Sequence, residues 1–322
     1  MLNTSKDFLF KNLEDNNIKF SLFNTLTRES WDNEIYKVKE TSISFISFNL
    51  LYEVEYFNCN LDSSFFLYSK DYDEIFIMKF LIIESQLKYI QFYFSEFYDF
   101  KKGKTIIRVL DLFLKDKNYK ILTSPYISNL NTFLMLKLKG ENKIKSSIEL
   151  FVNLNLSKDT LWMNLRKSYK GLINYTSKNL IISSEINEEV WKECEDFHIR
   201  TSGKRTRSHK TWEIQFDAIS KGKAKLLYIK QEGKIIGFSL FYIGNKTSYY
   251  AVGVYDRSLF KKYGISHYLL WHHILYLKSN DFDCLYLGRY FSDELENDKK
   301  LNNIVDFKLG FANKLTSNIQ IN

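Results

Sequence analysis

Residues 234–288 read KIIGFSLFYIGNKTSYYAVGVYDRSLFKKYGISHYLLWHHILYLKSNDFDCLYLG, and this stretch decides the fold. Two apolar runs, 236–243 and 249–255, lie on either side of a short polar turn and predict neighbouring strands. A loop with two lysines and one glycine follows, and the apolar segment 266–278 after it is long enough for a buried helix. Because strands and helices are intermixed, the stretch indicates a mixed sheet with helices packed on it.

The rest of the second half continues the same alternation. Ser157 precedes a segment with leucines at helical spacing, so it is expected to cap one helix that extends past Leu172 and Ile173. We expect further strands at 147–156, 180–183, 225–230 and 284–288, and further helices at 188–198, 210–221 and 301–311.

The first half also mixes strands and helices. Two apolar runs, 64–68 and 74–83, predict a hairpin around a polar turn, and residues 105–116 have the spacing of an amphipathic helix. The polar, glycine-led segment 140–143 is the best candidate for a boundary. We therefore predict an α+β chain with an N-terminal half at 1–145 and a C-terminal half at 146–322.

The composition excludes several classes of protein. The chain has 322 residues, of which 45% are hydrophobic and 26% charged, so it can bury a core and is not disordered as a whole. No stretch approaches the ~18 apolar residues of a membrane span, and the N-terminus lacks the apolar core of a secretion signal. Three scattered cysteines favour neither a disulfide framework nor a zinc knuckle. We expect a cytoplasmic protein.

The net charge of +8 belongs entirely to the second half. Residues 1–150 carry 20 basic and 20 acidic side chains, whereas 151–322 carry 26 and 18. All five histidines lie between His198 and His273. This asymmetry favours an anion-binding site in the second half, although a mild basic excess also serves solubility alone.

Four segments carry a resemblance to a known family: LWMNLRKS at 161–168, GFSLF at 237–241, the helix at 269–278, and VDFKLGF at 305–311. Their order is similar to that of the FemAB-like branch of the GNAT acyltransferase superfamily, in which two GNAT-like halves share one chain. The resemblance covers about 150–320 well and 40–145 only by element order. It implies two halves, each a mixed central sheet flanked by helices, with a degenerate N-terminal scaffold half and an active C-terminal half.

By this resemblance, the loop before the apolar helix binds the pyrophosphate of an acyl-CoA, most simply acetyl-CoA. The family has Arg or Gln where this chain has Lys261, and a small residue where it has Ser266, so the match is one of layout. Two alternatives remain open. In one, the loop binds no ligand and Ser266 serves only as a helix cap; in the other, the donor is an aminoacyl-tRNA. The implied donor-binding residues are Val254, Lys261, Lys262, Gly264, Ile265 and Ser266.

The segment 198–210 carries five basic residues, two histidines and no acidic residue. Guanidinium groups can hold phosphate or carboxylate in a bidentate manner, so we expect this loop to bind the acceptor's negative group. A solvated loop is the plain alternative. A nucleic-acid patch is a third one, although the loop lacks aromatic residues for base stacking. The acceptor-binding residues named here are His198, Arg200, Arg205 and Arg207.

The same resemblance implies that the strand at 249–255 splays from its neighbour to admit the acyl donor, so the end of this strand is expected to face the substrates. Asp256 or His267 would accept the proton of the attacking amine, and Arg257 would anchor an anionic substrate. Tyr250, Arg289 and Lys308 complete the predicted substrate-binding set. We expect no metal site, because the adjacent His272 and His273 point apart on a helix.

The resemblance implies an N-acyltransferase that passes an acyl group from acyl-CoA to an amine of a cell-envelope or glycan precursor. The acceptor would be an amino sugar or a peptide, nucleotide- or lipid-linked, and the enzyme cytoplasmic or peripheral to the inner face of the membrane. Two alternatives stay open. One is an aminoacyl-tRNA-dependent transferase of the peptidoglycan-bridge type, and the other is a non-catalytic module that binds an anionic glycan or RNA.

Overall fold

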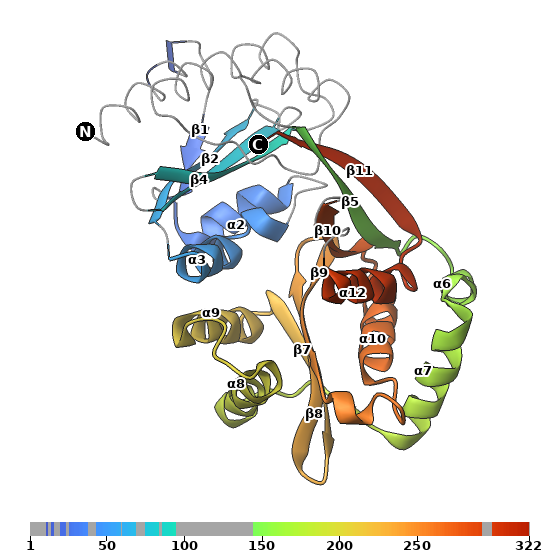
Figure 1. Cartoon of the computed structure of the whole chain (residues 1–322). Helices are drawn as coiled ribbons and strands as arrows, with labels where there is room; N and C mark the ends of the chain where they lie inside the picture. Colours follow the sequence, from blue (N-terminus) through green and yellow to red (C-terminus); the bar gives the residue numbers. More distant parts are fainter. Residues whose placement is uncertain are drawn as a thin grey trace. The chain divides into compact units, whose positions relative to one another are not determined.

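The computed structural model describes residues 20–94 and 144–321, except for 24–25, 38–42, 59, 69–74, 84–85 and 292–297 (Figure 1). It also describes the single positions 11, 14 and 15. The chain forms two compact units, residues 1–147 with 317–322, and residues 148–316. The predicted helix at 105–116 and the boundary segment at 140–143 lie outside the described residues.

The N-terminal unit contains an antiparallel sheet in the order β1-β2-β3-β4. Its hairpin pairs Tyr68 with Ile75, which confirms the two predicted strands. The expected mixed character of this sheet is not seen among the described residues, where its ladders are antiparallel. The elements are β1 Phe20–Leu22, α2 Arg28–Lys37, η2 Ile43–Phe45, α3 Ser47–Tyr56, β2 Asn60–Tyr68, β3 Ile75–Ile83 and β4 Gln86–Phe94.

The C-terminal unit is built on a mixed sheet in the order β11-β5-β10-β9-β8-β7-β6. Its strands are β5 Ile144–Asn153, β6 Ile182–Ser183, β7 Ala224–Gln231, β8 Lys234–Ile243, β9 Thr247–Tyr255, β10 Cys284–Phe291 and β11 Lys314–Ile321. Its helices are α6 Lys158–Asn164, α7 Lys167–Asn179, α8 Glu188–Ser202, α9 His209–Ser220, η3 Arg257–Leu259, α10 Ile265–Ser279 and α12 Lys299–Leu309. The predicted α+β architecture of helix-flanked sheets is confirmed.

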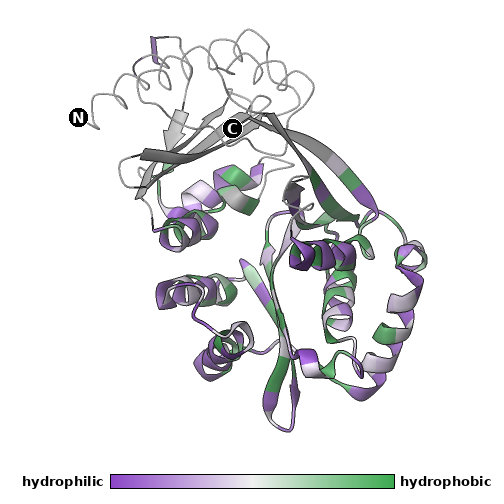
Figure 2. Cartoon of the chain, in the orientation of Figure 1, coloured by the Kyte–Doolittle hydropathy of each residue, from purple (hydrophilic) through white to green (hydrophobic). Residues whose placement is uncertain are grey.

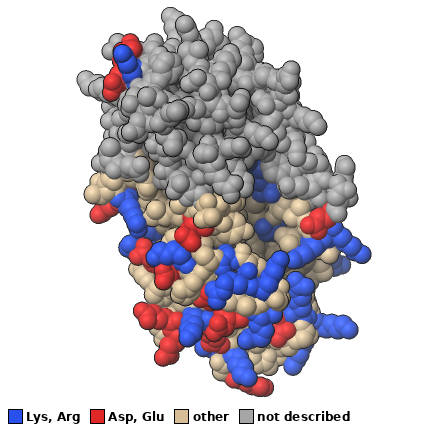
Figure 3. Space-filling model, turned by 60° about the vertical axis from the view of Figure 1, so that its left-hand side comes forward, with Lys and Arg blue, Asp and Glu red and all other residues tan. Residues whose placement is uncertain are grey.

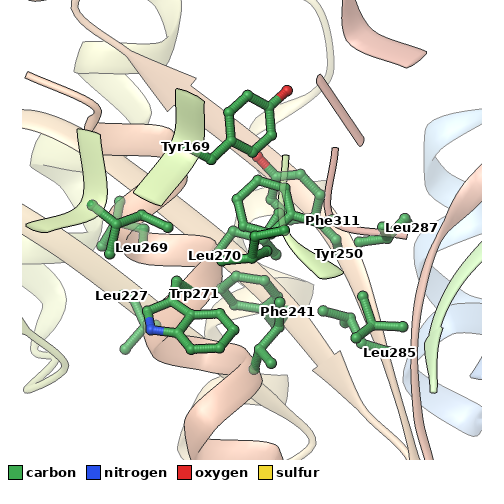
Figure 4. Close-up of a cluster of buried hydrophobic side chains, with 14 of the residues drawn as sticks. Tyr169, Leu227, Phe241, Tyr250, Leu269, Leu270, Trp271, Leu285, Leu287 and Phe311 are labelled. Atoms are coloured by element: carbon green, nitrogen blue, oxygen red, sulfur yellow. The ribbon is translucent and has the colours of Figure 1, made fainter. Parts of the chain in front are cut away.

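Helix α10 packs on one face of this sheet, and α8 packs on the other. A Cβ at Gly237 of β8 would lie 2.6 Å from Ile265 of α10, whereas the next residue, Phe238, contacts Phe197 of α8. Figure 2 shows α10 as mainly hydrophobic and α8, α9 and α12 as largely hydrophilic on their outer faces. Figure 4 shows Phe241, Tyr250 and Phe311 together in the core beside α10, with Leu285 and Leu287 of β10 next to them.

Two helix boundaries differ from the prediction. The single helix expected after Ser157 is divided at Leu165, whose ψ of 141° is extended. Contacts with α12 and its C-terminal end stabilise this interruption. Arg166 donates its backbone N–H to Gly310 O (3.0 Å), and its two guanidinium Nη groups donate to the Asp306 carboxylate (2.7 Å each). Helix α8 runs to Ser202 rather than to His198, and it ends at Gly203, which has a φ of 75°. His198 and Arg200 therefore lie on a helix, and the basic loop is confined to 203–208.

Candidate functional site

The centre of the C-terminal unit is a fork between two parallel strands. Strands β9 and β10 pair only over three positions, from Thr247↔Cys284 to Tyr249↔Tyr286. Both strands continue for several residues beyond this ladder without pairing to each other. An opening therefore forms at the carboxyl ends of two parallel strands, which is where sheets of this kind bind ligands.

A β-bulge lies where β9 leaves its partner. On the neighbouring strand β8, Leu240 pairs with Val252 and the next residue, Phe241, pairs with Tyr250, so Ala251 is left without a Cα partner. A bulge bends the strand and leaves the extra residue outside the ladder. It accounts for the separation of β9 from β10 at this point.

The fork opens into a cavity of about 830 Å³. Its walls come from β9, from the first turn of α10, from α12 and from the end of α8. Among the lining residues that the structure describes, Arg257, Lys300 and Lys308 are basic and none is acidic. Most of the other lining side chains are apolar, among them Leu172, Phe260, Ile304 and Phe307. The cavity therefore suits a partly apolar ligand that carries negative charge.

Lys308 lies inside the fork. Its ammonium group donates to Leu287 O of β10 and lies 5.2 Å from the ring centre of Tyr250 on β9. No acceptor for its other two N–H groups is found in the part of the chain that the structure describes. Burial lowers the pKa of Lys308 to about 8. A cation that is desolvated and only partly hydrogen-bonded can stabilise negative charge that develops on a bound carbonyl oxygen.

Two histidines also line the cavity. His267 is surrounded by aromatic rings, with centroid distances of 4.3 Å to Tyr169 and 5.0 Å to Phe307. Burial, assisted by the positive charge of Arg166, lowers the pKa of His267 to about 4. The pKa of His198 is also lowered, first by burial and then by Arg207. Both imidazoles are therefore neutral near pH 7 and can accept a proton, although His267 is a weak base.

The structure brings part of the predicted site together. The cavity is lined by His198, Tyr250, Val254, Arg257, Gly264, Ser266, His267 and Lys308. The other predicted residues, Arg200, Arg205, Arg207, Asp256, Lys261, Lys262, Ile265 and Arg289, do not line it. Asp256 instead caps a short helical turn, since its carboxylate accepts from Ser258 N (2.9 Å) and Ser258 Oγ (2.7 Å).

The loop before α10 offers fewer groups to a phosphate than its sequence indicates. Gly264 donates its N–H to Thr176 Oγ1 of α7 (2.8 Å), and Ile265 is fully buried in the core. Lys261 and Lys262 are exposed outside the cavity. The first turn of α10 nevertheless reaches the cavity through Ser266 and His267 and has no capping side chain, so its N–H groups favour an anion there.

Gly264 is required for packing. A Cβ at this position would lie 2.7 Å from Leu172 Cβ of α7. Any larger residue would displace α7, so a substitution at Gly264 tests the contact between two helices as much as it tests ligand binding.

The arginines outside the cavity have structural partners. Arg205 pairs with the buried Glu195 (2.6 Å), which also contacts His209 at the start of α9 (3.0 Å) and thereby ties the loop 203–208 to α8. The Arg207 guanidinium stacks on Trp212, 3.9 Å from the ring centre. Arg289 donates to the buried Glu149 (2.9 Å). Lys and Arg side chains nevertheless gather on the face of the C-terminal unit seen in Figure 3.

Sequence reasoning missed Lys300 and Phe307 on α12 and Tyr255 on β9, all of which line the cavity. Phe307 lies beside Lys308 in the closing motif and could have been included on that ground. Tyr255 could not have been included, because residues five positions apart on a regular strand point to opposite faces, and Tyr250 was the one expected to face the substrate.

Because two histidines are buried and neutral in the folded protein, we expect its free energy of unfolding to fall in acid. His267 and the fully buried His273 have pKa values below the unfolded value of about 6.5, the former about 4. The unfolded chain therefore binds more protons below pH 6.5, and the free energy of unfolding should fall between pH 6.5 and 4, by about 1 kcal/mol per pH unit for each histidine. Urea unfolding at pH 7.5, 6 and 5 measures this loss, and His267→Phe should reduce it. An unchanged slope for His267→Phe would contradict the assignment.

Within the described residues, no set of three or more His, Cys, Asp or Glu side chains could hold a metal ion. Nor does any described helix combine the length and hydrophobicity of a membrane-spanning segment.

Comparison with known proteins agrees with this fold. Residues 191–300 match the family model of the acetyltransferase (GNAT) domain. No curated protein sequence matches the chain. Among solved structures, FemX is similar with a TM-score of 0.68 and 12% identity over 92% of this chain and 96% of that chain.

Two further structures share the fold. The C-terminal domain of a putative lysylphosphatidylglycerol synthetase from Agrobacterium fabrum has a TM-score of 0.58 and 10% identity, with 91% of each chain covered. A tandem GNAT protein from the clavulanic acid biosynthesis pathway has a TM-score of 0.53 and 10% identity, with 95% of this chain and 98% of that chain covered. At such low identities these similarities establish the fold.

Proposed function

We propose that the protein transfers an acyl group from an acyl-CoA to an amine on a cell-envelope or glycan precursor. The match of residues 191–300 to the GNAT domain model and the similarity of the fold to that of FemX support this proposal. The observation that carries this proposal is the fork between β9 and β10 with the ammonium of Lys308 inside it. FemX and the lysylphosphatidylglycerol synthetase domain share this fold, which supports an acceptor related to peptides or lipids.

The chemistry follows from the groups present. The acceptor amine attacks the carbonyl carbon, a C–N bond forms, the C–S bond of the thioester breaks, and the amine proton leaves through a base. Lys308 stabilises the negative charge that develops on the carbonyl oxygen. His198 and His267 are the neutral nitrogen bases of the described lining, so either can take up the proton. Asp256 is less well suited, because it does not line the cavity and its Oδ1 atom already accepts two hydrogen bonds from Ser258.

The charges of the cavity support the same substrates. Phosphates of the donor would lie at the first turn of α10, near Ser266. Arg257 and Lys300 would bind the negative group of the acceptor at the cavity rim. Acetyl-CoA is the simplest donor to test.

A second donor class is favoured by one observation. Because Gly264 N–H is used by Thr176, the loop has lost one donor that a pyrophosphate would bind. An aminoacyl ester, such as an aminoacyl-tRNA, needs no pyrophosphate site at this loop. The third class, a non-catalytic anion-binding module, receives little support from the loop 203–208, where Arg205 pairs with Glu195 and Arg207 stacks on Trp212.

Thermal unfolding with added ligands distinguishes these functions. Acetyl-CoA, longer acyl-CoAs and nucleotide-linked amino sugars should raise the melting temperature, since a ligand at ~100 times its Kd adds roughly 2.7 kcal/mol of stability. Release of free thiol from acetyl-CoA should then require an amine acceptor. A rise with aminoacyl-tRNA alone would select the second donor class. Binding of uncharged RNA that is lost steeply with salt, without any effect of acyl donors, would select the binding module.

A further inference from the structure

Three hydroxyl groups form a buried chain that ends at the cavity. Tyr250 Oη lies 2.6 Å from Tyr255 Oη, and Tyr255 Oη lies 2.7 Å from Ser239 Oγ. Tyr250 and Tyr255 line the cavity, whereas Ser239 is fully buried in β8. Tyr250 was expected to bind the substrate, but neither the group that it binds nor any role for Tyr255 and Ser239 follows from the sequence.

The bulge at Ala251 makes this chain possible. In a regular strand, residues five positions apart point to opposite faces, so Tyr250 and Tyr255 would lie on different sides of the sheet. One extra residue between them reverses this relation and places both on the face of α10. Gly253 lies between them on that face, opposite Ser239. A Cβ there would overlap Tyr250 Oη and lie 2.7 Å from Tyr255 Oη, so glycine leaves room for the two hydroxyls to meet.

The direction of the chain follows from the effect of each hydrogen bond on the two tyrosines. Beyond the effect of burial, the hydrogen bonds from Tyr255 and Ser239 lower the pKa of Tyr250, whereas the hydrogen bond to Tyr250 raises the pKa of Tyr255. Ser239 and Tyr255 therefore donate toward Tyr250. The remaining proton, that of Tyr250, lies at the cavity, where a ligand or water can accept it.

Both tyrosines stay protonated in neutral solution. Burial raises the pKa of Tyr250 to about 12 and that of Tyr255 well above its usual value of 10. A hydroxyl that accepts a hydrogen bond also donates a stronger one, so Ser239 and Tyr255 reinforce the donation by Tyr250.

We propose that Tyr250 is a hydrogen-bond donor of fixed direction that binds the carbonyl oxygen of the acyl donor in the fork, and that Tyr255 and Ser239 position it. This inference rests on the proposed acyl transfer and adds a neutral donor beside the cationic Lys308. No proton is transferred along the chain, because it ends at the buried Ser239.

The test compares the dissociation constants of acetyl-CoA and free CoA, measured by calorimetry, since their ratio isolates the contacts of the acetyl group. Tyr250→Phe should reduce the preference for acetyl-CoA about tenfold, the equivalent of one hydrogen bond of about 1.4 kcal/mol. Ser239→Ala should reduce it two- to threefold, and Ser239→Thr, which keeps the hydroxyl, should restore it. In a Tyr250→Phe background, Ser239→Ala should have no further effect.

An unchanged ratio in Tyr250→Phe would overturn the inference, as would an effect of Ser239→Ala that persists without the Tyr250 hydroxyl. If the wild-type chain binds neither compound, the acyl-CoA donor is wrong, and the direction of the chain is then measured without ligand. Hydrogen–deuterium isotope shifts at the labelled tyrosine Cζ atoms should show the Tyr250 proton exchanging at least tenfold faster than the Tyr255 proton. Equal or reversed rates would overturn the inference.

Discussion

Lys308→Met is expected to lower kcat for acyl transfer by about 10²- to 10³-fold while the protein stays folded. Removal of one preorganised donor to a developing oxyanion typically costs this much. The methionine side chain fills similar space without a charge, so the buried site between β9 and β10 no longer holds an ammonium that is only partly hydrogen-bonded. The melting temperature should therefore be equal to or above that of the wild type.

Two further measurements distinguish stabilisation of the carbonyl oxygen by Lys308 from the general effect of a positive charge in the cavity. Lys300 lines the same cavity but is exposed on α12, so Lys300→Met should change KM several-fold and leave kcat nearly unaltered. Because Lys308 acts as a cation with a pKa of about 8, kcat in the wild type should decline as the pH rises above 8. A folded Lys308→Met protein with kcat within threefold of the wild type would exclude Lys308 from the reaction.

The order of the elements in the second half could be predicted because each is long, periodic and ended by polar residues. Strands β7, β8 and β9 and helix α10 were all placed within one or two residues. The resemblance implied that β9 splays from its neighbour, but the bulge at Ala251 on which the fork depends could not be predicted, since no residue type in YYAVGVY specifies it. The same bulge turns Tyr255 into the cavity, which explains why this residue was missed.

The basic residues show a different limit of sequence reasoning. The arginines of the segment 198–210 were expected to bind an acceptor, but Arg205 pairs with Glu195, ten residues earlier on α8. A carboxylate three turns away in sequence contacts this loop only because α8 extends to Ser202 and reverses at Gly203. In contrast, Lys308 was recognised by its motif alone, and the structure adds that its ammonium is enclosed in the fork.

Gly310→Ala is expected to destabilise the C-terminal unit by about 1–3 kcal/mol, the usual cost of overpacking a rigid core. Gly310 is the next-to-last residue of the Phe307–Phe311 motif, and its Cα lies against the ring of Tyr169 on α7. An added Cβ would overlap Tyr169 Cε2 and lie 2.7 Å from its hydroxyl oxygen. The ring cannot move freely, because it also contacts His267 and Phe311, with centroid distances of 4.3 and 5.1 Å.

The same substitution at Gly171 should raise the free energy of unfolding instead of lowering it, so Gly171→Ala is a matched control. Gly171 is an exposed residue in the middle of α7, and an added Cβ there would have no atom within 4 Å. Glycine inside a helix costs roughly 0.5–1 kcal/mol relative to alanine, so Gly171→Ala should stabilise the protein by this amount. Both variants restrict the unfolded chain equally. The difference between their free energies of unfolding in urea therefore measures the crowding at Tyr169 together with the helical preference at Gly171. If Gly310→Ala is as stable as the wild type, the Tyr169 ring does not lie against Gly310, and α6, α7 and α12 are not joined in the way described here.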